Sequence, residues 1–271
     1  MRLVPAAIVI ALVGFAPVRF QAAGADEPTL SIDEMRQFLT TAKVVASHRA
    51  GKGITSPWRL TLSNGSLTHD AAFQTVDEYS SRREFADGSV EINFVDSYRY
   101  DIAAYAVAGL IGLDGMMPVT ASRSWQGKVG AISWWVPWKL DEQMRLKQKI
   151  EAPDPPAWNA QMRRMRVFTA LVYDTDRNLT NVLITEDWKL WMIDFTRAFR
   201  LHPTLPDPRQ LLTCDRNLLA HLRALQRTDV EAAVGKSLNK LEIDALMSRK
   251  DRIVEHYDRL VAEKGEAAVL Y

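Results

Sequence analysis

The stretch 173–195 restricts the possible folds more than any other part of the chain. It begins with polar, turn-forming residues and continues as two short apolar runs, 182–185 and 190–193, separated by a polar turn. Short apolar runs on either side of such a turn predict a β-hairpin. The segment 158–172 before it has apolar residues at helical spacing. We therefore expect a helix, a polar loop and a hairpin in direct succession.

Three polar residues of this stretch form a candidate chemical site. Asp176 and Asn181 lie five residues apart in the loop, and Asp194 ends the second strand of the hairpin. Because the two strands are antiparallel, Asp194 should lie close to Asn181, where the first strand begins. Phosphoryl transfer requires a carboxylate that accepts or orients the attacking hydroxyl, and oxygen ligands for a divalent metal ion. Asp176 fits the first role, and Asn181 and Asp194 fit the second.

The spacing of Asp176 and Asn181 is by itself a weak signal, because Asp and Asn are common in turns and helix caps. Its position between a helix and a hairpin ending in Asp194 strengthens it. The strands expected before this stretch and the helices expected after it strengthen the signal further.

The first half of the chain favours short strands with two helices. A capping box formed by Ser31 and Glu34 predicts a helix up to about Lys43, and a second amphipathic helix is expected over 98–113. Strands are predicted over 44–47, 58–62, 71–76, 118–122 and 129–136, with a hairpin turn at 63–66 and a turn at 126–127. A mostly antiparallel lobe should therefore end near Pro137.

The second half favours helices. The segment 140–156 is expected to be a linker with at most a short helix, and helices are predicted over 209–225 and 242–261. Thr228 and Glu231 have the spacing of a capping box at the start of a further helix.

From Val44 to the C-terminus, this arrangement resembles the atypical protein kinase-like superfamily. That superfamily includes HipA-type kinases, the Golgi casein kinase group and phosphatidylinositol 3/4-kinases. The resemblance rests on D-R-x-x-x-N at 176–181, then the hairpin and Asp194-Phe195. It implies an α+β, two-lobed kinase-like fold with an antiparallel-sheet N-terminal lobe, 26–137, and a mainly helical C-terminal lobe, 138–271.

The resemblance also implies a nucleotide site with ATP or another nucleotide and Mg²⁺ or Mn²⁺ as cofactors. Asp176 is the implied catalytic residue, and Asn181 and Asp194 are the implied metal ligands. The implied nucleotide-binding residues are Gly51 and Gly53 over the phosphates, Gln74 and Asp101 beside them, and Trp135 in the hinge that contacts the base.

Two features depart from the pattern of the superfamily. Gln74 and Asp101 stand where a Lys and a Glu usually form an ion pair. Thr196-Arg197 follows Asp194-Phe195 where Gly is typical, and Arg197 has two interpretations, a cation directed into the site or a partner of a nearby carboxylate.

These features leave three functions open. The first is a phosphotransferase that modifies a hydroxyl of a protein or small molecule. The second is a pseudokinase that binds a nucleotide, a metal ion or a protein without catalysis. The third is a nucleotidyl transferase. The near balance of 34 Lys and Arg with 33 Asp and Glu does not favour a nucleic-acid partner.

The N-terminus predicts export. Arg2 is followed by an apolar run, 3–15, and by small residues that fit cleavage after Ala25. We therefore expect residues 1–25 to be a signal peptide and the protein to be periplasmic or secreted. No later apolar run approaches the roughly 20 residues of a membrane span. Cys214 is the only cysteine, so a disulfide within the chain is impossible.

Overall fold

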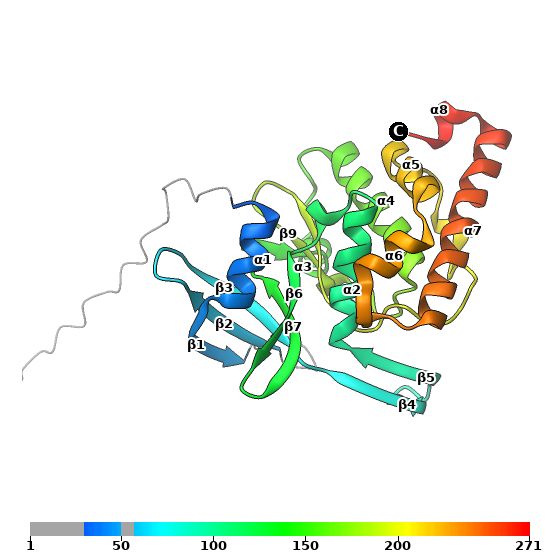
Figure 1. The fold of residues 1–271 in the computed structure, drawn as a ribbon. Coiled ribbons are helices and arrows are strands. Elements are labelled where there is room, and N and C mark those ends of the chain that lie inside the picture. The colour runs from blue at the N-terminus through cyan, green and yellow to red at the C-terminus, as the bar shows by residue number, and fades with distance from the viewer. Residues whose placement is uncertain (1–29, 50–56) are drawn as a thin grey trace, which may run out of the picture. The chain divides into compact units, whose positions relative to one another are not determined.

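A computed structural model describes residues 30–49 and 57–271. Gly51 and Gly53 lie outside the described residues. Residues from Ser31 to Tyr271 form one compact unit with a strand-rich lobe and a helical lobe (Figure 1). The two-lobed α+β architecture agrees with the sequence-based expectation.

The strand-rich lobe contains a five-stranded antiparallel sheet in the order β1-β2-β3-β7-β6. Its strands are β1 (Lys43–Arg49), β2 (Trp58–Ser63), β3 (Thr68–Gln74), β6 (Thr120–Trp125) and β7 (Lys128–Trp134). The turns contain residues with positive φ. Gly65 (φ 95°) lies between β2 and β3, and Gln126 and Gly127 (φ 50° and 74°) join β6 to β7.

The two faces of this sheet have different surroundings, because successive side chains along a strand point to opposite faces. Phe73 and Ile132 belong to the buried core, together with Phe38 of α1 (Ile32–Thr41) and Val107 of α2 (Tyr98–Leu110). Their neighbours on the opposite face, such as Ala72, line a pocket between the lobes.

Helix α1 begins where the sequence predicts. The Ser31 side chain accepts a hydrogen bond from the Glu34 amide, and the Glu34 carboxylate accepts one from the Ser31 amide (2.8 Å). These two bonds satisfy amides that have no partner within the helix.

A further hairpin, which the sequence does not predict, separates β3 from α2. It consists of β4 (Asp77–Glu84) and β5 (Val90–Ser97), and it extends away from the body of the molecule in Figure 1. Most of its residues are exposed on both faces. The alternation of apolar and polar residues that marks a half-buried strand is therefore weak here.

The helical lobe begins with a short strand and a short helix, β8 (Leu140–Asp141) and α3 (Glu142–Lys147), and continues with α4 (Pro155–Val172). The predicted hairpin is present as β9 (Val182–Ile184) and β10 (Leu190–Met192), and β8 pairs with β9. The remaining helices are α5 (Arg216–Ala224), α6 (Arg227–Val234), α7 (Lys240–Lys264) and α8 (Glu266–Val269), and short 3-10 turns lie at Asp114–Met116, Leu179–Asn181, Pro208–Gln210 and Gly235–Ser237.

The capping box predicted at Thr228 and Glu231 is wrong by two residues. The cap of α6 is Gln226, whose amide donates to the Asp229 carboxylate (3.2 Å). Thr228 and Glu231 lie inside the helix instead.

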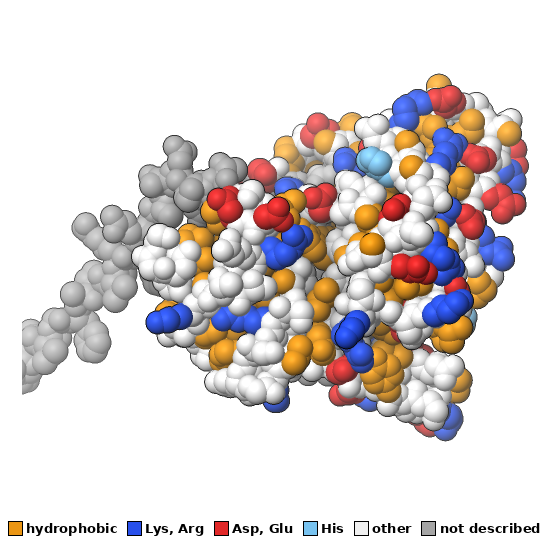
Figure 2. All heavy atoms as spheres, in the orientation of Figure 1, with side chains coloured by type: hydrophobic (Ala, Val, Ile, Leu, Met, Phe, Trp, Pro, Cys, Tyr) orange, Lys and Arg blue, Asp and Glu red, His pale blue; other side chains and the backbone are white. Residues whose placement is uncertain are grey.

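The face of the molecule in Figure 2 carries Lys and Arg interspersed with Asp and Glu, in keeping with a formal net charge of +1. Within the described part of the chain, no helix is long and apolar enough to cross a membrane.

Candidate nucleotide-binding site

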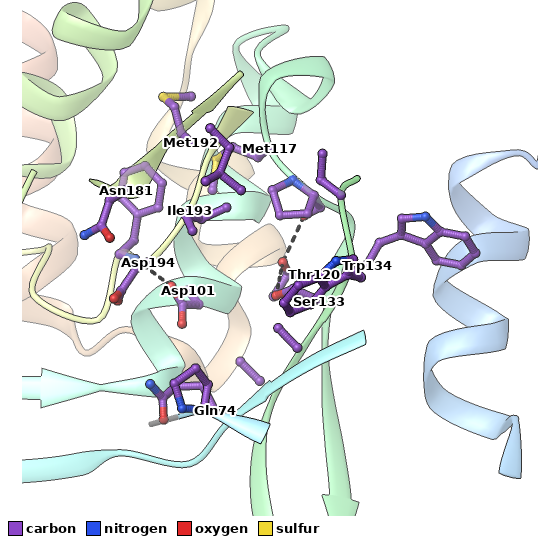
Figure 3. Close-up of a pocket in the computed structure, with 18 of the residues that line it drawn as sticks. Gln74, Asp101, Met117, Thr120, Ser133, Trp134, Asn181, Met192, Ile193 and Asp194 are labelled. Atoms are coloured by element: carbon purple, nitrogen blue, oxygen red, sulfur yellow. Dashed lines mark hydrogen bonds between the residues drawn. The ribbon is translucent and has the colours of Figure 1, made fainter. Parts of the chain in front are cut away.

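A cavity of about 270 Å³ lies between the strand-rich lobe and the helical lobe (Figure 3). Five of the sequence-predicted site residues line it: Gln74, Asp101, Trp135, Asn181 and Asp194. One end is polar, and the remainder is lined mainly by apolar side chains.

The loop before β9 positions Asn181. The Asn181 side-chain amide donates to the Asp176 carbonyl (3.2 Å), and the Ile193 amide donates to the Asn181 carbonyl (3.1 Å). The first bond uses the nitrogen of the side chain, so the oxygen is available as a ligand. Asp194 follows β10 with a φ of 58°, a left-handed conformation that Asp tolerates better than most residues.

Arg177 connects the loop to the hairpin. It forms a buried ion pair with Asp174 (2.6 Å), and the two side chains are 8% and 0% exposed. It also donates to the carbonyls of Asn181 (3.0 Å) and Asp194 (3.0 Å). Its guanidinium lies 4.0 Å from the centre of the Phe195 ring. Arg177 therefore fixes the backbone of both candidate metal ligands.

Asp101 and Asp194 form a pair of carboxyl groups at the polar end (Figure 3). Asp101, in the first turn of α2, accepts a hydrogen bond from the Phe195 amide (2.6 Å). Burial, and then the charge of Asp194, raise the pKa of Asp101 well above its usual value. Burial also raises the pKa of Asp194, and a hydrogen bond from Thr196 and the charge of Arg177 partly offset this. Two such carboxyl groups favour protons or a cation between them.

Thr196 occupies the position where a glycine is typical, and Arg197 follows it. The Thr196 hydroxyl donates to Asp194 Oδ1 (3.0 Å), and the Thr196 carbonyl accepts from the Ser97 amide (2.9 Å). Arg197 pairs with Glu91 of β5 and lies over the Phe94 ring. Of the two interpretations of Arg197, the ion pair is therefore the one observed.

Gln74 lines the same cavity as Asp101. Gln74 Oε1 accepts hydrogen bonds from the amides of Thr75 (2.9 Å) and Val76 (3.3 Å). Gly130 of β7 permits the close packing here, because a Cβ atom at that position would lie 2.3 Å from the Gln74 carbonyl oxygen. Among the described residues that line the cavity there is no Lys or Arg.

The segment after β7 forms the opposite end of the cavity. The Trp135 amide donates to the Asp70 carbonyl (3.1 Å), and the Trp135 ring contacts the Arg59 guanidinium at 4.3 Å. The next residue, Val136, also lines the cavity. Among the hydrogen bonds of the described residues, none involves the amide or carbonyl of Val136. These groups are thus available to a planar ligand, and Val136 lies in the segment 134–137 that the sequence resemblance implied as the hinge.

Asp176 differs from the other predicted site residues in its environment. Its carbonyl supports Asn181, but its side chain is exposed and is not among those that line the cavity. The Asp176 carboxylate therefore faces solvent.

Sequence reasoning also missed Asp141, a buried residue that lines the cavity. Its carboxylate accepts from the Met144 amide (2.7 Å) as the N-cap of α3. Asp is a preferred N-cap residue, so the position of Asp141 directly before a short helix could have identified it as a cap.

No protein-family model matches the chain, and no curated protein matches its sequence significantly. Solved structures do match. A hydra Fam20 with sugar is 14% identical, with 89% of this chain and 92% of that chain covered and a TM-score of 0.65. A Golgi casein kinase with Mn/ADP bound is 13% identical, with 88% and 78% covered and a TM-score of 0.65. The Helicobacter pylori proinflammatory kinase CtkA is 10% identical, with 83% and 98% covered and a TM-score of 0.53.

These similarities show that the chain has an atypical kinase-like fold. The two-lobed fold implied by the sequence resemblance is therefore confirmed. Identities of 10–14% carry the fold alone, and the roles of individual residues rest on the geometry of the site.

Proposed function

We propose that this protein is an exported phosphotransferase that uses a nucleotide and a divalent metal ion to phosphorylate a hydroxyl group. The observation that carries the proposal is the convergence of Asn181, Asp194 and Asp101 at one end of an otherwise apolar interlobe cavity. An apolar slot suits a base, and oxygen ligands suit a metal ion that accompanies phosphates.

The chemistry of the carboxyl pair fits a divalent cation. The raised pKa values of Asp101 and Asp194 reflect two buried carboxyl groups without sufficient compensating charge. Asn181 and Asp194 would hold the ion, with Asp101 adjacent. A bound ion of this kind offsets negative charge on phosphate oxygens during transfer. Among the described residues no group of three His, Cys, Asp or Glu side chains could hold a metal alone, so phosphate or water oxygens would complete the set.

Asp176 is the proposed catalytic residue. In the transfer, the acceptor hydroxyl oxygen forms a bond to the terminal phosphorus while the bond to the leaving nucleoside diphosphate breaks, and Asp176 accepts the hydroxyl proton. Its exposed position supports this role, because an acceptor must reach it from solvent. The acceptor is a hydroxyl of a protein or a small molecule.

Thermal unfolding with ADP and Mn²⁺ tests the binding part of this proposal. A ligand of the native state raises the midpoint, and we expect this shift in the wild type but not in Asp194→Ala. Incubation with γ-labelled ATP then tests transfer, which Asp176→Asn should abolish without removing the ADP-induced shift. Absence of a shift in the wild type would contradict the proposal.

The second candidate function is a pseudokinase, and the observation that favours it is the lack of Lys or Arg among the described residues lining the cavity. Gln74→Lys distinguishes the two functions. A charge-assisted contact to phosphate is roughly twice as strong as a neutral one, so this variant should bind ADP more tightly. If the wild type binds nucleotide without transfer and Gln74→Lys acquires transfer, the pseudokinase is supported.

Export is proposed on the sequence of residues 1–25, which lie outside the described residues. Similarity to a Golgi casein kinase supports it, since that protein's name places it in an exporting compartment. Intact-mass measurement of protein from its native host should give a mature N-terminus near Asp26, and retention of residues 1–25 would contradict export.

A further inference from the structure

Two hydroxyl groups lie side by side on the cavity wall formed by the sheet. Thr120 of β6 and Ser133 of β7 both line the cavity, and their oxygen atoms are 2.8 Å apart (Figure 3). Thr120 Oγ1 is also 2.9 Å from the Pro118 carbonyl oxygen. The three groups form a chain of two hydrogen bonds.

The Pro118 carbonyl fixes which group donates in each of the two hydrogen bonds. A carbonyl oxygen can only accept, so the single hydroxyl proton of Thr120 is donated to Pro118. Thr120 must then accept in the other bond, and Ser133 donates its proton to Thr120. With its proton committed, Ser133 presents only lone pairs to the cavity. Ser133 is thus a hydrogen-bond acceptor toward any ligand.

The position of Ser133 along the sheet is at the apolar end of the cavity. Ala131 of β7 pairs with Gln74 of β3, whereas Ser133 pairs with Ala72. Two residues along a strand span about 7 Å, so Ser133 lies one such step away from Gln74. Apart from Thr120, its paired neighbour on the cavity wall is the apolar Ala72. This is the part of the cavity that suits a base, as argued in the proposed function on which this inference rests.

We propose that Ser133, oriented by Thr120, is a specificity-determining residue that selects a base with a hydrogen-bond donor at its exocyclic position. The 6-amino group of adenine can donate to Ser133. The 6-carbonyl group of hypoxanthine or guanine would place lone pairs against lone pairs, and one buried acceptor would stay unsatisfied. The site therefore discriminates between 6-amino and 6-oxo purines, and it favours adenine nucleotides.

The first experiment measures dissociation constants, with Mn²⁺ present, for ADP and for purine riboside diphosphate, which lacks only the 6-amino group. In the wild type ADP should bind roughly 3- to 10-fold more tightly, the value of one neutral hydrogen bond. In Ser133→Ala the ratio of the two constants should fall toward one. A change in folding stability affects both ligands alike and leaves this ratio unchanged, so the ratio reports recognition and not structure.

The second experiment reverses the polarity of the hydroxyl pair. Thr120→Val removes the acceptor that fixes the Ser133 proton, so Ser133 can donate to a carbonyl, and the preference for ADP over inosine diphosphate should decrease about 5-fold or more. Thr120→Ser retains the chain and should behave as the wild type.

An unchanged ADP ratio in Ser133→Ala would overturn this inference while leaving the proposed nucleotide binding intact. Failure of every form, wild type included, to bind ADP would overturn the proposed function and this inference with it.

Discussion

Thr196 is the residue whose role differs most from the kinase pattern. Its hydroxyl donates to Asp194 Oδ1, and its side chain is otherwise buried, with 3% of the residue exposed. A glycine would leave that oxygen without this donor. We interpret Thr196 as a positioning residue for Asp194.

Replacing Thr196 by Val should therefore weaken Mn²⁺-dependent ADP binding by about tenfold. A hydrogen bond to a charged group contributes roughly 1.5–3 kcal/mol, and Val retains the shape of Thr. The matched control is Thr196→Ser, which keeps the hydroxyl and should restore most of the affinity. Titration calorimetry with ADP and Mn²⁺ measures both, and equal losses in the two variants would show that packing, not the hydroxyl, is responsible.

Asp101 should have opposite effects on stability and on binding. The pKa of Asp101 is raised in the folded protein, so the protonated carboxyl favours the folded state. This contribution to the free energy of unfolding is fully present below about pH 4, the pKa in the unfolded chain, and it is lost as the pH rises through the folded pKa. Asp101→Asn should stabilise the metal-free protein at pH 7 by about 1 kcal/mol, because the amide of Asn does not ionise beside the buried Asp194 carboxyl and one pKa unit corresponds to roughly 1.4 kcal/mol. Asn retains an acceptor for the Phe195 amide.

The measurement compares thermal midpoints of wild type and Asp101→Asn from pH 4 to pH 8. The difference should grow with pH in the absence of metal, and a shift of roughly 2–4 °C is expected at neutral pH. Mn²⁺ and ADP should raise the midpoint of the wild type more than that of the variant. A variant less stable than the wild type at every pH would contradict the carboxyl-pair interpretation.

The residues with readable spacing were the ones that the sequence could identify. Asn181 and Asp194 were placed by the loop and the hairpin, and both line the cavity. Arg177 and Thr196 were not assigned these contacts, since their partners depend on how the loop packs against the hairpin. Gly51 and Gly53 stay predictions.

Among the elements, the strands of the main sheet, its turns and the cap of α1 could be predicted from the sequence, whereas the cap of α6 was misplaced by two residues. The capping box of α1 and the turns at Gly65 and Gly127 are local interactions, and each was predicted correctly. The β4–β5 hairpin was missed because burial does not impose a pattern on it. Its anchor is instead an ion pair of Glu91 with Arg200 (2.9 Å) and with Arg197.

The loop before β9 depends on one buried ion pair, and its removal should destabilise the whole element. Asp174→Asn leaves the Arg177 guanidinium buried without its carboxylate, which typically costs about 3–5 kcal/mol. The control is Asp33→Asn, because Asp33 and Arg36 have the same three-residue spacing and a 2.8 Å contact but are 90% and 47% exposed. That pair should contribute less than about 1 kcal/mol. Urea unfolding of both variants gives the comparison, and equal losses would contradict the assigned role of Arg177.

At the scale of the whole molecule, α2 joins the two lobes. Asp101 at its start contacts the segment after β10, Val107 belongs to the core shared with the sheet, and the helix packs against α6. The sequence predicted α2 as an amphipathic helix of the strand-rich lobe. Its attachment to the helical lobe could not be predicted, because it depends on pairs such as Tyr100 and Glu242, which are 142 residues apart.

Loss of this attachment should lower the stability of both lobes together. The Tyr100 hydroxyl donates to the buried Glu242 carboxylate (2.5 Å), and burial raises the pKa of Tyr100. Tyr100→Phe leaves one oxygen of a buried carboxylate without its donor, which costs about 1–3 kcal/mol. Because α2 contacts both lobes, the variant should still unfold in a single transition at a lower midpoint, with the ADP-induced shift retained. Differential scanning calorimetry checks this, with Tyr79→Phe as the control on the exposed hairpin, and two separate transitions in Tyr100→Phe would mean that the lobes unfold independently and that α2 does not couple them.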